Sequence, residues 1–286
     1  MILFGDPKPT SEQLAQLAMA GDTVTVTPPP VYAAPAYPPL AAQPWIAIDI
    51  ETANGRPEEA ERWMRLHYTP PSNYKTAEAC GKAYLEMREK KTEKRALLDS
   101  SPVVIVTVQT ASAGLYGLHC LGAAEPAPHG GTAGTVQGFA TAREMLIALR
   151  RGLDGLADEG TTIVGHNIIG FDLPKLRWAY LKAGLRMPYA LAPSASQPVF
   201  DSMRQYGKHF SQVEKPFIAL ADLLEEFGIP SHKSELDGSK VPGMVEKILA
   251  GEREHLDPLL TYALKDAAVE AHLFLAMTGQ LPDRSE

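Results

Sequence analysis

Four carboxylates and one tyrosine in this chain have types and spacings that suit metal chemistry. They lie in three separate segments of the sequence, as Asp49 and Glu51, then Asp172, then Tyr262 and Asp266. If the fold brings the four acids together, they form an all-oxygen site with a charge of about −4. Such a site suits hard divalent cations such as Mg²⁺ or Mn²⁺, whereas Zn²⁺ prefers nitrogen and sulfur ligands. A carboxylate cluster that holds two such cations is what phosphodiester hydrolysis needs.

The first two acids lie on a short apolar segment that the sequence predicts to be a strand. Successive side chains of a strand point to opposite faces, so Asp49 and Glu51 share one face. The other face then carries Ile46, Ile48 and Ile50, which can pack into a core. Two acids side by side repel each other unless a cation lies between them. The alternative is a strand that faces solvent with ordinary polar alternation.

The remaining three residues lie at or on predicted helices. Asp172 follows a turn that contains glycine and precedes Leu173, so the alternative to a metal ligand is a helix N-cap. Tyr262 and Asp266 are four residues apart, which places them on one helix face among apolar neighbours. An aspartate in such surroundings needs a partner or a metal. The alternative is a tyrosine in the core and an aspartate at the helix edge.

The rest of the chain supplies the elements that must position these residues. Periodicity and β-branched content predict strands at 45–50, 103–110, 115–121 and 161–164. Helical spacing predicts helices at 140–156, 172–183, 216–228 and 241–250, and a last helix that ends at Gly279. Residues 122–138 read as a loop rich in glycine, alanine and proline. Strands first and then alternation with helices predict a layered α/β domain.

Composition divides the chain into an arm and a main domain. Residues 28–44 hold seven prolines, which cannot pair in a sheet and favour an extended conformation. We therefore interpret residues 1–44 as an N-terminal arm with a proline-rich linker and residues 45–280 as the main domain. The arm is either a docking segment for a protein partner or a tether without a function of its own.

Several function classes are disfavoured by composition. The 286 residues include two cysteines, Cys80 and Cys120, with no CxxC pair, so a disulfide framework or zinc finger is not expected and a reducing cytoplasm fits. No run of about 18 apolar residues exists, so no membrane association is expected. The formal net charge of −7 argues against general nucleic-acid affinity, although cations bound at an acidic site change the local sign.

One stretch is basic despite the overall negative charge. Residues 75–95 hold seven basic and four acidic side chains, and Lys90, Lys91 and Lys94 are among the basic ones. Aromatic residues such as Trp63 and Tyr84 are interleaved nearby, a mixture that binds single-stranded nucleic acid by stacking and phosphate contacts. We expect these lysines to guide a nucleic-acid strand towards the acids. The alternative is a solvated charged helix whose aromatic residues face the core.

Taken together, the three segments resemble the exonuclease motifs of the DEDD 3′–5′ exonucleases. The matches are Asp-x-Glu on a first strand, Asn-x(4)-Asp after a later strand and Tyr-x(3)-Asp on the last helix. The tyrosine is typical of the DEDDy subgroup, because Thr261 stands where the other subgroup carries histidine. The resemblance is strongest to the proofreading exonuclease domain of family B DNA polymerases and its stand-alone relatives. It covers roughly residues 45–278.

The resemblance implies a ribonuclease-H-like α/β fold with a mixed five-stranded sheet flanked by helices. Residues 55–98, whose composition predicts charged helices, are longer than the simplest family members need, and we interpret them as an insertion after the first strand. By resemblance, two Mg²⁺ or Mn²⁺ ions would be bound by the four acids, and Tyr262 would orient the attacking water. Thr52 would help hold the terminal nucleotide, and Asn167 would support the second motif. Asp201 and Lys233 would be structural positions near the site.

The function that the resemblance implies is metal-dependent removal of nucleotides from a 3′ end, with single-stranded DNA favoured as the substrate. Two alternatives stay open. One is an exoribonuclease similar to ribonuclease D, because such enzymes use the same residue set. The other is a catalytically weak module that binds nucleic acid. An unrelated nucleotide-binding protein is disfavoured, because the chain lacks the glycine-rich phosphate-binding loops.

Overall fold

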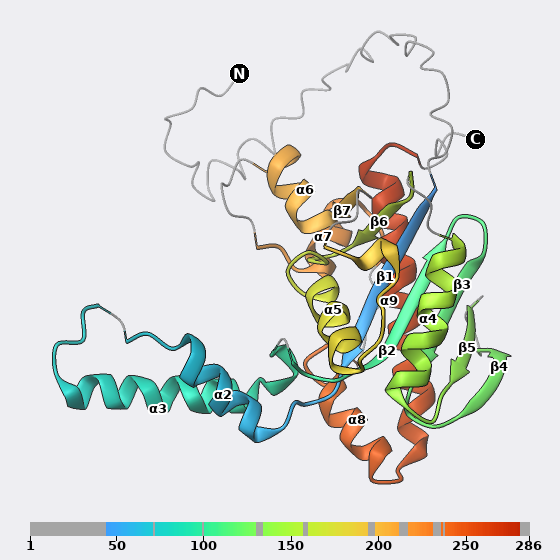
Figure 1. The fold of residues 1–286 in the computed structure, drawn as a ribbon. Coiled ribbons are helices and arrows are strands. Elements are labelled where there is room, and N and C mark those ends of the chain that lie inside the picture. Colours follow the sequence, from blue (N-terminus) through green and yellow to red (C-terminus); the bar gives the residue numbers. More distant parts are fainter. Residues whose placement is uncertain are drawn as a thin grey trace, which may run out of the picture. The chain divides into compact units, whose positions relative to one another are not determined.

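A mixed sheet runs through the protein and carries the first two acids on one of its interior strands (Figure 1). The computed structural model describes residues 44–70, 72–98, 100–129, 134–156, 160–193, 198–211, 217–230, 236 and 238–280. Within these residues the sheet has seven strands, in the order β4-β5-β3-β2-β1-β6-β7. Their bounds are β1 Trp45–Thr52, β2 Val103–Thr110, β3 Gly114–His119, β4 Ala124–Pro128, β5 Gly134–Gly138, β6 Thr162–Gly165 and β7 Val199–Asp201.

Strand β1 is paired along most of its length on one side but only over its first residues on the other. β1 pairs antiparallel with β2 along most of its length, from Ile46 to Thr52. On its other side it pairs in parallel with β6, but only over Trp45 to Ala47. The second half of β1, which contains both acids, therefore extends beyond the end of β6.

Helices cover both faces of the sheet. Helix α4 (Ala142–Leu156) and helix α5 (Asp172–Lys182) lie on one face, and helix α9 (Leu256–Met277) lies on the other (Figure 1). The isoleucines of β1 pack with α4 and α5, where Met145, Leu146 and Leu176 are fully buried. On the opposite face α9 packs against β1, β2 and β6 and against helix α8 (Val241–Leu249). Outside the insertion, the other α-helices of the described chain are α6 (Ser202–His209) and α7 (Leu220–Glu226).

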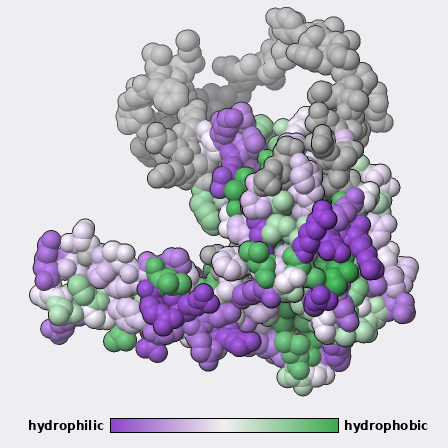
Figure 2. Space-filling view, in the orientation of Figure 1, coloured by the Kyte–Doolittle hydropathy of each residue, from purple (hydrophilic) through white to green (hydrophobic). Residues whose placement is uncertain are grey.

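The insertion follows β1 as predicted and contains two helices and a short 3₁₀ turn. These are α2 (Pro57–His67), α3 (Ala77–Glu93) and η1 (Arg95–Leu97). Thr76 caps α3 through its hydroxyl, and α3 buries none of its own residues. Figure 1 shows α3 projecting away from the sheet, and Figure 2 shows hydrophilic residues gathered over this part of the surface. The insertion is thus a helical extension that is packed mainly at its base.

Two sequence predictions about the sheet were wrong. Within the described residues the sheet has seven strands and not five, and residues 124–128 and 134–138 of the predicted loop form β4 and β5. β5 pairs with β3 over five residues, so backbone hydrogen bonding overrides the weak strand propensity of its glycines. β4 is an exposed edge strand, where Pro126 and Pro128 are tolerated because one side of an edge strand needs no ladder partner.

Some predictions fall outside the residues that the structure describes. Residues 1–43, which make up nearly all of the predicted N-terminal arm, lie outside them, and so does Lys233. Within the described part of the chain, no helix has the length and apolar character needed to span a bilayer.

Candidate metal centre

Three of the predicted acids meet across the interface between β1 and α9. Each of Asp49, Glu51 and Asp266 offers a carboxylate oxygen that lies within 4.8 Å of the others. Side-chain alternation puts both β1 acids on the α9 face, while Ile48 and Ile50 pack on the other face. Glu51 and Asp266 are buried and Asp49 is half-buried, so the cluster opens to solvent at Asp49.

The fourth predicted acid reaches the same group from α5. Asp172 is the first residue of that helix, and its Oδ1 accepts a hydrogen bond from the backbone N–H of Ile50 at 3.2 Å. This N–H is available because β6 ends its pairing with β1 three residues earlier, at Ala47. Burial raises the pKa of Asp172 to about 8, against the lowering effect of its backbone hydrogen bonds and of Lys175. Asp172 therefore acts through Ile50 to tie the second motif to the first.

Tyr262 lies one helical turn before Asp266 and shares its face of α9. Its side chain is buried and hydrogen-bonded to Asp266. Burial, followed by the charges of Asp266 and Glu51, raises the pKa of Tyr262 well above its ordinary value. A Cβ built on Gly238 would lie 3.7 Å from the Tyr262 hydroxyl, so the segment before α8 passes close to the phenol. The phenol thus stays protonated at neutral pH and can donate a hydrogen bond but cannot act as a base.

The structure adds an acid that the sequence analysis missed. Glu270 lies one turn after Asp266, is 5% exposed, and accepts a hydrogen bond from the backbone N–H of His166 through Oε1 at 3.1 Å. The spacing of Tyr262, Asp266 and Glu270 at four-residue intervals was the available signal, because such residues share one helix face. We use "carboxylate centre" below for Asp49, Glu51, Asp172, Asp266 and Glu270.

The acids of the carboxylate centre destabilise one another's ionised forms. Burial is the main reason that the pKa values of Asp49, Glu51 and Glu270 lie well above their ordinary range. Mutual repulsion adds to this effect, and Glu270 has the largest influence on Asp49 of all its charged neighbours. Buried like charges of this kind need cations or protons to balance them.

Two buried carboxylate oxygens of the centre have no hydrogen-bond donor within the described residues. These atoms are Asp49 Oδ2 and Glu270 Oε2. Unpaired buried carboxylate oxygens are costly, and they are the donor atoms that Mg²⁺ and Mn²⁺ accept. The residues present therefore fit a hard divalent cation, which Asp49, Glu51, Asp172 and Asp266 would hold.

Asp201 organises the turn that leads into α5. Its carboxylate accepts hydrogen bonds from the backbone N–H groups of Asn167 at 3.1 Å, Ile169 at 3.2 Å and Arg204 at 3.3 Å. Asn167 adopts a left-handed backbone conformation, with a φ of 56°. The Oδ1 atom of Asn167 lies so close to Gly170 that a Cβ on residue 170 would clash with it. Asn167 and Asp201 thus shape the turn that presents Asp172, and Asp201 in addition caps α6.

The structure gives Thr52 a contact with the insertion. The Thr52 side chain is buried, and its hydroxyl donates to the carbonyl oxygen of Ala96 at 3.1 Å. The Lys175 ammonium donates to the same carbonyl at 2.9 Å and to Leu98 O at 2.6 Å, and it also bonds the Ser101 hydroxyl. These contacts hold the base of the insertion beside the first and second motifs.

The three predicted lysines lie within the insertion, Lys90 and Lys91 on α3 and Lys94 as its C-cap residue. Lys90 and Lys94 are exposed, and Lys91 places its ammonium 3.8 Å from the centre of the Trp63 ring. None of the three is among the charged groups that influence the pKa values of Asp49, Glu51, Asp172 or Glu270. The carboxylate centre is formed by residues of β1, α5 and α9, whereas these lysines belong to the insertion.

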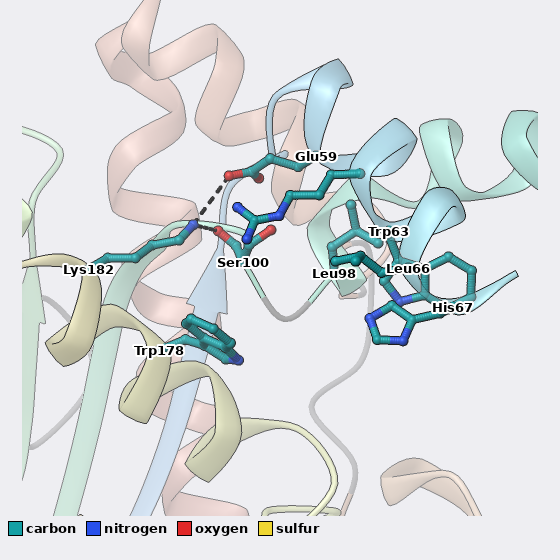
Figure 3. Close-up of a pocket in the computed structure, with 9 residues that line it drawn as sticks. Glu59, Trp63, Leu66, His67, Leu98, Ser100, Trp178 and Lys182 are labelled. Carbon is teal, nitrogen blue, oxygen red and sulfur yellow. Dashed lines mark hydrogen bonds and ion pairs between the residues drawn. The ribbon is translucent and has the colours of Figure 1, made fainter.

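A groove separates α2 of the insertion from α5 of the main domain (Figure 3). Trp63, Leu66 and His67 line it from α2, and Trp178 and Lys182 line it from α5. Lys182 bonds both Glu59 and the carbonyl oxygen of Ser100, which links the two walls. Trp178 is 47% exposed, so an aromatic surface is accessible at this groove.

A family comparison covers the part of the chain that carries three of the five predicted catalytic residues. Residues 135–278, half of the chain, match the family model of the RNase H superfamily. The chain belongs to the RNase H superfamily. The match includes β6, α5 and α9, and therefore Asp172, Tyr262 and Asp266 of this RNase H superfamily member. No curated protein matches the sequence.

Solved structures similar to this superfamily member include a family B DNA polymerase from the hyperthermophilic archaeon Pyrobaculum calidifontis. That likeness has 16% identity and a TM-score of 0.43, over 84% of this chain and 26% of the polymerase chain. A zinc-bound complex of Escherichia coli exonuclease I with single-stranded DNA shows 14% identity and a TM-score of 0.38, over 77% of this chain and 42% of the other. A product-bound exonuclease I shows 14% identity and a TM-score of 0.37, over 77% and 46%. The chain thus spans less than half the length of each.

Proposed function

We propose that this protein is a metal-dependent 3′–5′ exonuclease of the DEDDy type that hydrolyses the phosphodiester bonds of nucleic acid. One observation carries the proposal. Oxygen atoms of Asp49, Glu51 and Asp266 lie within 4.8 Å of one another, with Asp172 and Tyr262 adjoining them, on an RNase H superfamily scaffold. The buried oxygen atoms without donors support a pair of Mg²⁺ or Mn²⁺ ions as the species that completes this site.

Each residue of the proposed site has a separate task. Asp49, Glu51, Asp172 and Asp266 would hold the two cations, and burial of Glu51, Asp172 and Asp266 limits the access of bulk water to these three acids. When bound, the cations lower the pKa of a water and neutralise charge at the phosphorus. The Tyr262 phenol orients the attacking water by hydrogen bonding, because its raised pKa prevents it from taking the proton. The hydrogen bond from Ile50 N–H fixes Asp172 relative to β1.

Single-stranded DNA is the substrate that we favour. The sequence motifs are closest to the family B proofreading domains, and the exposed lysines of α3 and the aromatic groove supply phosphate and base contacts of the kind that single strands use. RNA is the alternative, because the same residues serve in ribonuclease-D-like enzymes. A nucleic-acid-binding module with weak catalysis is the second alternative. We keep protein docking through the proline-rich arm and a cytoplasmic location as proposals.

The test is a time course on matched 5′-labelled single-stranded DNA and RNA oligonucleotides with Mg²⁺, with Mn²⁺ and with EDTA. We expect a metal-dependent ladder that shortens from the 3′ end and is absent in Asp49→Ala. The relative rates on the two strands decide the sugar preference. If neither strand shortens with either metal, the exonuclease proposal fails and the binding module takes its place.

A further inference from the structure

The role of Glu270 is not explained by the four acids and the tyrosine assigned above. It lies on the same stripe of α9 as Tyr262 and Asp266, one turn further along, and its side chain is 5% exposed. A carboxylate this deeply buried needs partners for both oxygens. Oε1 has one in the His166 N–H, but Oε2 is buried and meets no donor within the described residues.

A second buried acid nearby shows what a purely structural carboxylate looks like here. Asp201 is 1% exposed and accepts three backbone N–H groups through its two oxygens. Glu270 is equally enclosed, yet only one of its oxygens is bonded. Its charge acts on Asp49 more strongly than that of any other neighbour, and its own charged neighbours include Asp172 and Asp266. Glu270, with only one oxygen bonded, therefore belongs with the acids of the proposed metal site and does not serve a backbone turn alone, as Asp201 does.

Building on the proposed function, we infer that Glu270 is a fifth carboxylate of the metal centre and that its Oε2 accepts a hydrogen bond from water in the hydration shell of a cation held by Asp49 and Asp266. Oε1 is engaged with the His166 N–H, so Oε2 alone remains, and contact through the water of a cation fits it better than direct ligation. Mg²⁺ keeps several of its waters when bound by proteins, and such waters need acceptors.

This position would also couple two motifs. Through Oε1, Glu270 holds the N–H of His166, which directly precedes the Asn167 turn that leads to Asp172. Through Oε2, it would contact the water of a cation bound by the first and third motifs. Glu270 is thus a positioning residue, and its effect is on cation affinity.

The variants Glu270→Gln and Glu270→Asp test the inference by Mn²⁺ titration calorimetry on the full chain, with metal-free thermal unfolding as the check on folding. Gln keeps an oxygen that can accept the His166 N–H but loses the charge. Asp keeps the charge, but its side chain is one methylene shorter, so the carboxylate lies farther from the site. We expect Glu270→Gln to weaken Mn²⁺ affinity by roughly 10- to 100-fold without lowering the metal-free midpoint, and Glu270→Asp to weaken it less. Asp257→Asn removes an exposed acid from the same helix and should leave Mn²⁺ affinity unchanged.

Two results would overturn the inference in distinguishable ways. If the wild type binds Mn²⁺ and both Glu270 variants bind it equally well, Glu270 only supports the backbone at His166, and the proposed exonuclease centre stands. If the wild type itself binds no Mn²⁺, the centre and the role of Glu270 both fail.

Discussion

The carboxylate centre and the insertion hold their charged residues in opposite environments. At the centre, Glu51, Asp172, Asp266 and Glu270 are buried among one another, and burial with mutual repulsion raises the pKa values of most of them. On the insertion, charges are exposed and some are paired with opposite charge, as in the 2.9 Å contact between Arg88 and Glu61. Exposed pairs of that kind contribute little to stability. The buried charges of the centre need cations or protons to balance them, whereas the exposed charges of the insertion are balanced by solvent and by one another.

We expect the largest loss of activity from a substitution at the carboxylate centre. We expect Asp49→Ala to lower exonuclease activity by on the order of 10³-fold or more, because it removes a cation ligand. The free energy of unfolding without metal should not fall, since the substitution also removes repulsion among buried acids. Activity assays and urea unfolding in EDTA check both halves. A variant that keeps most of its activity would show that Asp49 does not bind the cation, and one that unfolds would show that Asp49 is a structural acid.

Tyr262→Phe keeps the ring and removes the hydroxyl that contacts Asp266. We expect a loss of activity of about 10²-fold, smaller than for Asp49→Ala, because positioning is lost while the cations stay bound. Single-turnover rates measure the loss, and Mn²⁺ affinity should be nearly unchanged. Equal and complete loss in the two variants would contradict the assigned ranking.

The base of the insertion joins the two regions through Lys175. Lys175→Met should lower the free energy of unfolding by about 2–3 kcal/mol, because carbonyl oxygens of Ala96 and Leu98 lose their buried donor. Urea unfolding measures this change. Lys182→Met, on the same helix but with a half-exposed side chain, is the matched control and should change stability by less than 1 kcal/mol or so. An unchanged free energy for Lys175→Met would mean that the insertion is not anchored there.

We also expect the free energy of unfolding of the protein to depend on pH in opposite directions without metal and with Mn²⁺. An acid whose pKa is raised on folding binds more protons in the folded state, so the free energy of unfolding falls as pH rises above the unfolded value of about 4. For Asp172 this decline continues to about pH 8. We expect metal-free protein to be less stable at pH 8 than at pH 5, and Mn²⁺ to stabilise it most at pH 8. Urea unfolding at both pH values, in EDTA and in Mn²⁺, checks the sign, and the opposite trend in EDTA would contradict the assignment.

The smallest effect is expected on the insertion. Charge reversal of Lys90, Lys91 and Lys94 should raise KM for single-stranded DNA several-fold and flatten its salt dependence, with kcat nearly unchanged. The double reversal of Arg143 and Arg151, exposed on α4, is the control and should alter neither quantity. If the triple variant matches the wild type in activity and salt dependence, the insertion does not guide the strand.

Local patterns predicted the elements with strong periodicity. The β1 alternation that separates Asp49 and Glu51 from the isoleucines, and the helical stripe of Tyr262 and Asp266, are visible in single segments. Strands β4 and β5 were missed, because their glycines and prolines have low strand propensity and only pairing with β3 makes β5 a strand.

Local sequence patterns could not predict the long-range contacts at the site. The bond from Ile50 N–H to Asp172 joins residues 122 positions apart, and the bond from Thr52 to Ala96 spans 44. Glu270 was overlooked although it follows Tyr262 and Asp266 at four-residue spacing, because that spacing does not show which acids of other segments lie near it. The structure supplies those neighbours in Asp49, Asp172 and His166.

The most direct test of the account is a calorimetric titration of the full chain with Mn²⁺ at pH 8, repeated in buffers of different ionisation enthalpy. We expect two bound cations per chain, proton release on binding because buried acids must ionise, and loss of the tighter site in Asp49→Ala. No binding, or binding that Asp49→Ala leaves unchanged, would contradict the claim that these buried acids form a metal centre.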